Sequence, residues 1–171
     1  MQKFAGDIML SWGWKRNAIA FLSGFVLLFA LPPFDFFVVG FLSFPVLLWL
    51  LEGAAANPGT RGLVRHYRAA VIGWFFGFGY FVGGLWWIGR ALFEEGGQFI
   101  WALPLAVFGL PAMLAFFFAL GATFARMVWG RGIGAAAALA FGFGASEWLR
   151  GILFTGFPWN SFGYTWASLP Q

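Results

Sequence analysis

The sequence contains no cysteine among its 171 residues and only one histidine, His66. The lack of cysteine excludes disulfides, thiolate metal sites and a thiol nucleophile within this chain. A single histidine without suitably spaced partners does not favour a metal site. The pattern of a cleavable signal peptide is also missing, because the first apolar run is long and ends at Pro32-Pro33 rather than at small residues.

Charged residues are scarce as well. They make up 9% of the chain, against about 25% in a typical soluble domain. Hydrophobic residues make up 61%, the mean hydropathy is +0.82, and the aromatic residues include 25 Phe and 11 Trp. These values predict an integral membrane protein. The net charge of +4 comes from short basic clusters between apolar runs, which favours topology signals over nucleic-acid binding.

Five apolar runs predict an all-α fold, a polytopic membrane helix bundle with transmembrane helices over residues 17–33, 36–51, 69–93, 98–125 and 132–154. Residues 1–16 precede this bundle, and residues 155–171 follow it. The first two runs are short, so they either span or form a tight hairpin around Pro32-Pro33; we favour two spans joined by a short turn. Pro104 and Pro111 predict a kink in the fourth helix.

The basic residues predict the orientation of the bundle. Eight of the ten lie in segments on one side, namely Lys3, Lys15, Arg16, Arg61, Arg65, Arg68, Arg126 and Arg131. The positive-inside rule makes that side cytoplasmic. The N-terminus is then inside and residues 155–171 face the periplasm. Arg90 and Arg150 fall toward the outside, each near a carboxylate.

Glycine spacing in the third run predicts close helix packing. Gly73 with Gly77, and Gly79 with Gly83, form small-xxx-small pairs, which let two helix backbones approach each other. Trp87 follows near the outer interface. It is expected either in the aromatic belt of the membrane or in a lipid-binding groove.

The stretch EWLRGILFTGFPWN, residues 147–160, is the most specific candidate site. Glu147 and Arg150 are three residues apart and share one helix face. In one interpretation they form an ion pair that tethers the helix end. In the other, Arg150 meets an anionic lipid headgroup, because its planar fork of donors suits phosphate. Pro158 breaks the helix, and Trp159 is expected at the membrane surface, where an indole can line a site.

The outward-facing segments offer no complete catalytic apparatus. They hold serine and threonine hydroxyls but no histidine, and both lysines lie on the predicted cytoplasmic side. Catalysis by these 171 residues alone is therefore not expected.

Three blocks, FALPPFDFF, GWFFGFGYFVGGLWWI and EWLRGILFTGFPWNSFGY, occur in this order. Over nearly the whole chain, they resemble the membrane region of bacterial apolipoprotein N-acyltransferases. The resemblance implies a multi-pass enzyme of the bacterial inner membrane. Such an enzyme transfers an acyl chain from a phospholipid to the N-terminal cysteine amino group of an apolipoprotein, through a thioester on its own cysteine. It also implies a Glu-Lys-Cys triad in a nitrilase-like domain that this chain does not include, and it implies no cofactor and no nucleic acid.

By position in the matching blocks, the resemblance makes Trp159, Arg150, Glu147 and Pro158 neighbours of a lipid-facing entrance. Trp87 corresponds to a tryptophan at the outer end of the third helix. Trp159 is the first substrate-binding candidate and Arg150 the second. The chain is then expected to be an N-terminal fragment or a truncated gene product, inactive alone. The alternative is a non-enzymatic small membrane subunit, or a scaffold that packs on a partner through its glycine faces.

Overall fold

The computed structural model describes residues 2–56, 62–94, 99–153, 156 and 159–166. Every regular element within these residues is helical, as the sequence predicts. The longer helices are α1 (Gln2–Met9), α2 (Gly13–Leu27), α3 (Gly40–Ala56), α4 (Leu63–Gly84), α5 (Ile88–Glu94), α6 (Leu110–Met127) and α7 (Ile133–Ile152). Two stretches of the described chain, Phe37–Ala56 and Ile100–Met127, are long and apolar enough to cross a membrane. Five spans and their orientation remain predictions.

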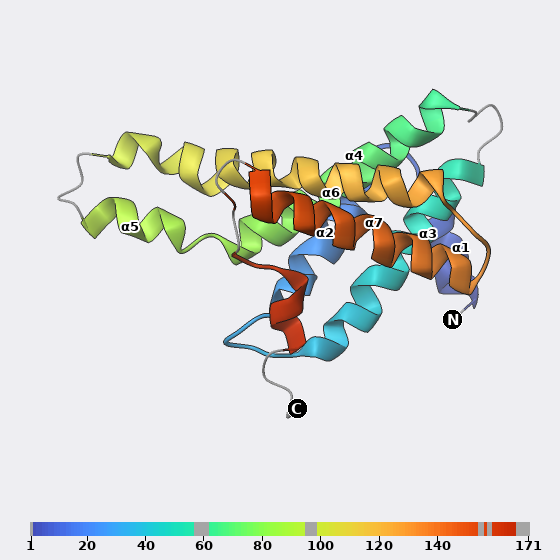
Figure 1. The fold of residues 1–171 in the computed structure, drawn as a ribbon, viewed down its shortest axis with the longest axis horizontal. Coiled ribbons are helices and arrows are strands. Elements are labelled where there is room, and N and C mark those ends of the chain that lie inside the picture. The colour runs from blue at the N-terminus through green and yellow to red at the C-terminus, as the bar shows by residue number, and fades with distance from the viewer. Residues whose placement is uncertain (1, 57–61, 95–98, 154–155, 157–158, 167–171) are drawn as a thin grey trace.

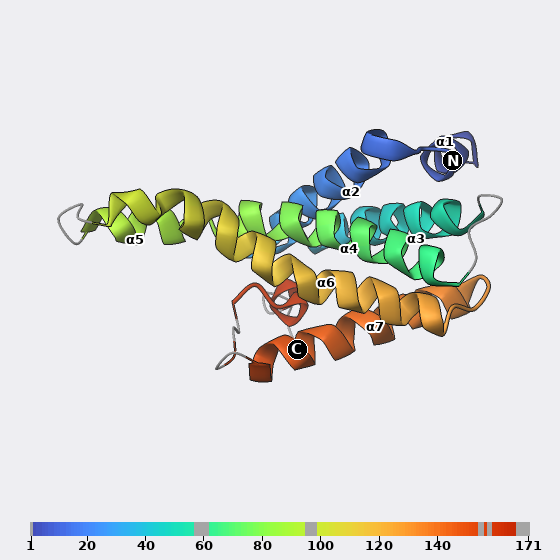
Figure 2. The same ribbon diagram turned by 90° about the horizontal axis from the view of Figure 1, so that it is seen from above.

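Helix α4 lies at the centre of the bundle, between α2 on one side and α6 on the other (Figure 1). Helix α7 packs against α6, and α3 packs against both α2 and α4 (Figure 2). The core between them is aromatic: Phe76 and Tyr80 of α4 stack on Phe118 of α6, with ring centroids 6.1 and 5.6 Å apart. The ring of Phe143 from α7 meets Phe118 edge-on at 5.2 Å. One aromatic cluster therefore joins three helices.

Glycines set how closely α4 approaches its neighbours. A Cβ atom at Gly73 or Gly77 would lie 2.6 Å from atoms of α6, closer than real side chains come. A Cβ at Gly79 would overlap the backbone carbonyl of Phe21 in α2, and one at Gly83 would overlap side chains on the same side. The predicted close packing at both glycine pairs is therefore confirmed. Both faces are used inside this chain, one for α6 and the other for α2.

The first two apolar runs form two helices joined by a short turn. Helix α2 begins at Gly13 and continues as a 3-10 turn, η1 (Leu28–Ala30). After the turn, which contains a cis peptide bond between Pro32 and Pro33, the chain enters η2 (Phe37–Val39) and then α3. Helix α2 starts at Gly13, four residues before the predicted run at residue 17. The apolar run predicts only the part of a helix that lies in lipid, whereas the helical hydrogen bonds extend into the polar residues before it.

The third run, predicted as one helix over residues 69–93, is split, and that prediction is wrong. Helix α4 begins earlier, at Leu63, and ends at Gly84; the next three residues turn before α5 starts. The break follows two adjacent glycines, Gly83 and Gly84, which together cost a helix about 2 kcal/mol relative to alanine. The other glycines of α4 are separated from one another, and the helix continues through them. The hydropathy pattern does not register this cost, since apolar residues continue on both sides of the break.

The fourth run is one continuous helical path that changes direction, as its prolines predict (Figure 2). It passes through η3 (Ile100–Ala102) and a π-helical turn, η4 (Leu105–Gly109), before α6. Pro104 directly precedes the π turn, and Pro111 lies in the first turn of α6. Proline lacks a donor and clashes with the carbonyl four residues earlier, and a π turn accommodates that clash.

The two ends of the bundle differ in charge. Helix α1, the start of α2 and the α6–α7 connection lie at one end, which we call the basic end (Figure 1). Within the described residues, that end carries seven basic side chains: Lys3, Lys15, Arg16, Arg65, Arg68, Arg126 and Arg131. The opposite end, which we call the far end, holds the turn at residues 31–36, helix α5 and the 3-10 turn η6 (Phe162–Trp166). By the positive-inside rule the basic end would be cytoplasmic, and this orientation stays a prediction.

Candidate functional site

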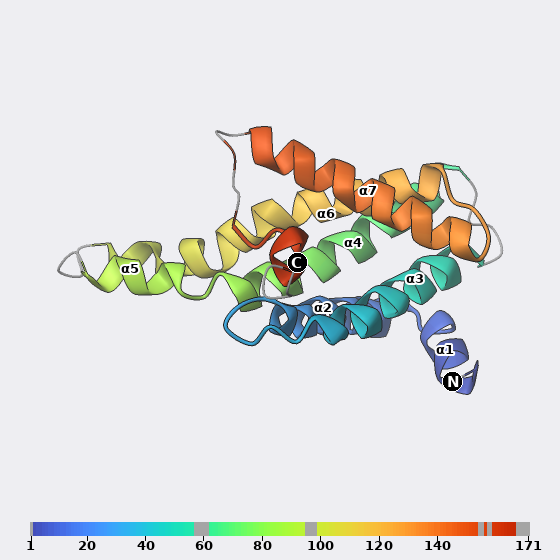
Figure 3. The same cartoon turned by 60° about the horizontal axis from the view of Figure 1, so that its bottom comes forward.

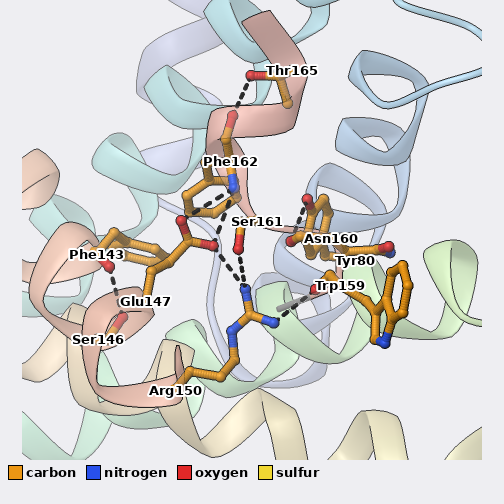
Figure 4. A network of polar contacts seen from close by, with 10 residues as sticks. All are labelled: Tyr80, Phe143, Ser146, Glu147, Arg150, Trp159, Asn160, Ser161, Phe162 and Thr165. Atoms are coloured by element: carbon orange, nitrogen blue, oxygen red, sulfur yellow. Dashed lines mark hydrogen bonds and ion pairs between the residues drawn. The ribbon is translucent and has the colours of Figure 1, made fainter. Parts of the chain in front are cut away.

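Glu147 and Arg150 lie one turn apart near the end of α7 and form an ion pair. The Arg150 Nη2 atom donates to Glu147 Oε1 at 3.0 Å (Figure 4). The Arg150 side chain is only 1% exposed, and the Glu147 side chain is 16% exposed. The predicted shared face is therefore confirmed. Both side chains point into the protein, toward the chain segment that follows α7.

The ion pair holds residues 159–162 against the bundle. Arg150 Nη1 donates to the carbonyl oxygen of Trp159 at 2.8 Å, and Nη2 also donates to Ser161 Oγ at 3.2 Å. In return, the backbone N–H of Phe162 donates to both carboxylate oxygens of Glu147, at 3.1 and 3.2 Å. Hydrogen bonds to charged groups each contribute about 1.5–3 kcal/mol. This small network is therefore strong enough to fix an irregular backbone.

A side chain of α4 also binds this segment through a hydrogen bond. The Tyr80 hydroxyl, fully buried, donates to the carbonyl oxygen of Asn160 at 3.0 Å. Asn160 itself has a φ of 56°, in the left-handed region that asparagine tolerates better than most residues. A buried tyrosine needs a partner for its hydroxyl, and the returning segment supplies it. The segment is thus bound to both α4 and α7.

Phe162 is the first residue of η6, which lies beside α4 (Figure 3), and its ring packs among residues of α3, α4 and α6. Its ring centroid lies 5.2 Å from that of Phe44 in α3, 5.5 Å from Tyr80 in α4 and 5.3 Å from Phe118 in α6. Thr165 Oγ1 donates to the carbonyl of Phe162 at 2.6 Å and closes the turn. Phe162 therefore joins the returning segment to the aromatic core.

A groove of about 540 Å³ opens at the far end beside this segment. Its walls come from three places: the turn at residues 31–34 with Leu28, the end of α4 with the following Trp86 and Trp87, and the residues Trp159, Asn160 and Tyr164. The Trp87 and Trp159 rings meet edge-on, with centroids 6.1 Å apart and an interplanar angle of 80°. These two indoles are 43% and 54% exposed. The groove is thus an apolar, aromatic surface with few polar groups.

The network and the groove share one residue, Trp159. Its carbonyl accepts from the buried Arg150, while its indole turns away from the network and lines the groove (Figure 4). Arg150 thus fixes the backbone from which the Trp159 ring projects. The geometry gives Arg150 a positioning role.

Of the predicted site residues, the structure brings Trp87 and Trp159 together in the groove. Glu147 and Arg150 do not line the groove but bind the backbone of residues 159 and 162, and Pro158 lies outside the described residues. This geometry matches the interpretation in which Glu147 and Arg150 form an ion pair that tethers the end of α7. The predicted contact between Arg150 and a lipid headgroup is not provided by this arrangement, because the side chain is 1% exposed and contacts the protein's own backbone.

Sequence reasoning missed Tyr80, Asn160 and Phe162. Tyr80 carried a usable signal, since a tyrosine inside an otherwise apolar run requires a hydrogen-bond partner. The partner itself, 80 residues further along the chain, gave none. Among the described residues, no group of three or more His, Asp or Glu side chains is placed to bind a metal ion.

Comparison with known proteins agrees with these features. Residues 23–171 match the model of the apolipoprotein N-acyltransferase N-terminal domain family. The chain is 54% identical over 170 residues to the apolipoprotein N-acyltransferase of Rhizobium rhizogenes, covering 99% of this chain and 32% of that protein. It is 56% identical over 168 residues to the protein of that name from Brucella suis, covering 98% and 32%.

The fold, with its two stretches apolar enough to cross a membrane, indicates a helical membrane protein with an aromatic groove at one end of its bundle. The chain belongs to the apolipoprotein N-acyltransferase family and corresponds to its N-terminal part. It spans about a third of the length of the curated relatives that it matches.

Proposed function

We propose that this chain is the membrane portion of an enzyme that transfers an acyl chain from a phospholipid to the N-terminal cysteine amino group of an apolipoprotein. Within that enzyme, the far-end groove receives the phospholipid. The observation that carries this proposal is the groove of about 540 Å³ whose wall contains both Trp87 and Trp159. Its size falls within the range of small-molecule pockets, about 300–1,000 Å³.

The lining of the groove suits a lipid. Leu31, Pro32, Pro33 and Phe34 supply an apolar wall for a hydrocarbon chain. An indole is apolar over its rings and donates one hydrogen bond through Nε1, so Trp159 can contact an acyl chain and an ester or phosphate oxygen together. The Arg150 bond to the Trp159 backbone keeps this indole in place before a lipid arrives. A preorganised wall lowers the cost of binding.

The covalent chemistry is proposed to lie elsewhere in the full-length enzyme. A cysteine thioester needs a thiol, and this chain contains no cysteine. We therefore expect the 171-residue chain alone to give no acyl transfer, with activity requiring the remainder of a full-length protein. The predicted inner-membrane location and the periplasmic position of the groove complete this proposal.

Substitution of Trp159 by alanine in a full-length version tests the role of the groove. We expect kcat/KM for the phospholipid to fall about 30-fold or more, since truncating a tryptophan at a binding surface costs about 2 kcal/mol or more. Transfer of the acyl group to a lipidated peptide with an N-terminal cysteine is the assay. Trp148→Ala is the matched control, because Trp148 is 67% exposed on α7 and is not part of the groove lining. Normal transfer by Trp159→Ala at equal protein levels contradicts the proposal.

The scaffold alternative loses its main support in this structure. It depended on glycine faces that are free to pack against a partner chain. The Gly73 and Gly77 face is covered by α6, and the Gly79 and Gly83 face is covered by α2. No other observation on the described residues favours a purely structural subunit over the acyltransferase proposal.

A further inference from the structure

A second pocket, of about 340 Å³, lies at the basic end, between the start of α2 and the first half of α4. Its polar lining consists of Arg16, Asn17, Tyr67 and Arg68, with the Trp12 indole beside them. No aspartate or glutamate is among the residues that line it. The pocket is on the opposite end of the bundle from the groove assigned to the proposed function.

Arg16 is the most buried of the polar residues in this pocket, with 8% exposure. Its Nε atom donates to the carbonyl oxygen of Ser11 at 2.9 Å, and Nη2 donates to the same oxygen. A carbonyl is a neutral partner, so these bonds position the guanidinium without cancelling its charge. Burial and the positive charge of the nearby Arg68 lower the pKa of Arg16, which lies just before the predicted first span. The two arginines therefore repel each other across this pocket.

Glu52, an acidic residue of α3, is not among the residues that line this pocket. It lines a separate pocket between α1, α2 and α3, to which Arg16 also contributes. The carboxylate is outside the lining of the pocket between α2 and α4, which Arg68 and Tyr67 line. Arg68 Nη1 also donates to the carbonyl oxygen of Ala54 in α3, at 3.4 Å, so a neutral partner helps to position this guanidinium as well. An anion that enters between α2 and α4 meets two guanidinium groups without a carboxylate in the lining.

The aromatic residues of the pocket indicate its depth in the membrane. Trp12 is 76% exposed and Tyr67 is 69% exposed, and both adjoin the paired arginines. Exposed tryptophan and tyrosine next to a basic cluster are typical of the headgroup layer. Basic pockets between membrane helices on the positive side bind anionic lipid headgroups.

We propose that the pocket between α2 and α4 binds the phosphate of an anionic phospholipid at the basic end of the bundle. The guanidinium groups of Arg16 and Arg68 contact the phosphate oxygens, as arginine does with planar, paired donors. Asn17 supplies an amide donor, and the Trp12 ring lies beside the glycerol region. Bound lipid relieves the repulsion between the two arginines and fixes the start of α2 against α4.

Native mass spectrometry of the full chain tests this site. The protein is purified in mild detergent and titrated with phosphatidylglycerol or phosphatidylcholine, and the bound lipid molecules are counted. We expect one phosphatidylglycerol to be retained in preference to phosphatidylcholine. Arg68→Gln should weaken the retention of phosphatidylglycerol about fivefold, and the double variant Arg16→Gln, Arg68→Gln should weaken it about 25-fold. Arg68→Lys, which keeps the charge but not the planar fork, should lie between Arg68→Gln and the wild type.

Arg131→Gln is the matched control, since Arg131 is an exposed arginine at the same end, outside this pocket. It should retain phosphatidylglycerol as the wild type does. Equal retention of the two lipids by the wild type, or equal retention of phosphatidylglycerol by wild type and Arg68→Gln, overturns the proposal. Displacement by an equal concentration of inorganic phosphate overturns the assignment to a lipid. Circular dichroism verifies helix content, and Arg68→Gln alone decides the result if the double variant does not fold.

Discussion

Replacing Arg150 with methionine is the sharpest perturbation of the far end. Methionine has a similar length and keeps the apolar contacts, but it removes the donors to Trp159, Ser161 and Glu147. Two of these bonds hold the returning segment directly. At about 1.5 kcal/mol or more for each bond to a charged group, the segment loses about 3 kcal/mol of its attachment. Such a loss corresponds to a local opening on the order of 100-fold more frequent.

The absence of cysteine supplies a clean assay for this opening. Thr165→Cys introduces one thiol at a position that is 7% exposed within η6. In this parent, a thiol reagent reacts slowly, because labelling requires the segment to leave the bundle. We expect Arg150→Met in the same background to raise the labelling rate by on the order of 100-fold.

Arg131→Met in that background is the control, and it should label at the parental rate because surface substitutions change stability by about 0.5 kcal/mol or less. Glu147→Gln should fall between the two, since it keeps the shape of the side chain but leaves Arg150 buried without its anionic partner. An unchanged labelling rate in Arg150→Met would refute the conclusion that this network holds residues 159–162 in place.

Two further predictions concern packing. Gly79→Ala should lower the thermal unfolding midpoint in detergent, because the new Cβ overlaps the Phe21 backbone and overpacking costs about 1–3 kcal/mol. Gly144→Ala is the control and should not lower the midpoint, because there is open space at its Cβ. Equal midpoints for the two variants would contradict the close approach of α2 and α4. Phe162→Ala should destabilise the protein by about 1–3 kcal/mol, because this partly buried ring packs against the aromatic core. Phe116→Ala, at a 62% exposed ring, should have little effect, and similar unfolding curves for both variants would argue against packing of Phe162 on the core.

The sequence alone was sufficient for the helical class, the glycine contacts and the proline kink. These properties depend on residues close together in the chain. Gly73 and Gly77 lie on one face of α4 through spacing alone, and Pro104 changes the helix through its own missing donor. Glu147 and Arg150 were likewise paired correctly, because three residues bring side chains onto one helix face. The helix break after Gly84 was missed, since apolar residues continue on both sides of it.

Only the tertiary structure decided where the Arg150 side chain points and that the Trp159 ring packs against Trp87. Arg150 turns inward because the returning segment presents a carbonyl oxygen and a hydroxyl, and burying a guanidinium is tolerable only when such groups meet it. Trp87 and Trp159 are 72 residues apart in sequence, and their rings meet because hydrogen bonds from Tyr80 of α4 and Arg150 of α7 hold residues 159–160 beside the end of α4. Hydropathy and helical periodicity are local properties of the chain. The groove arises from contacts between distant segments, so the sequence determined its residue types and the fold determined that they meet.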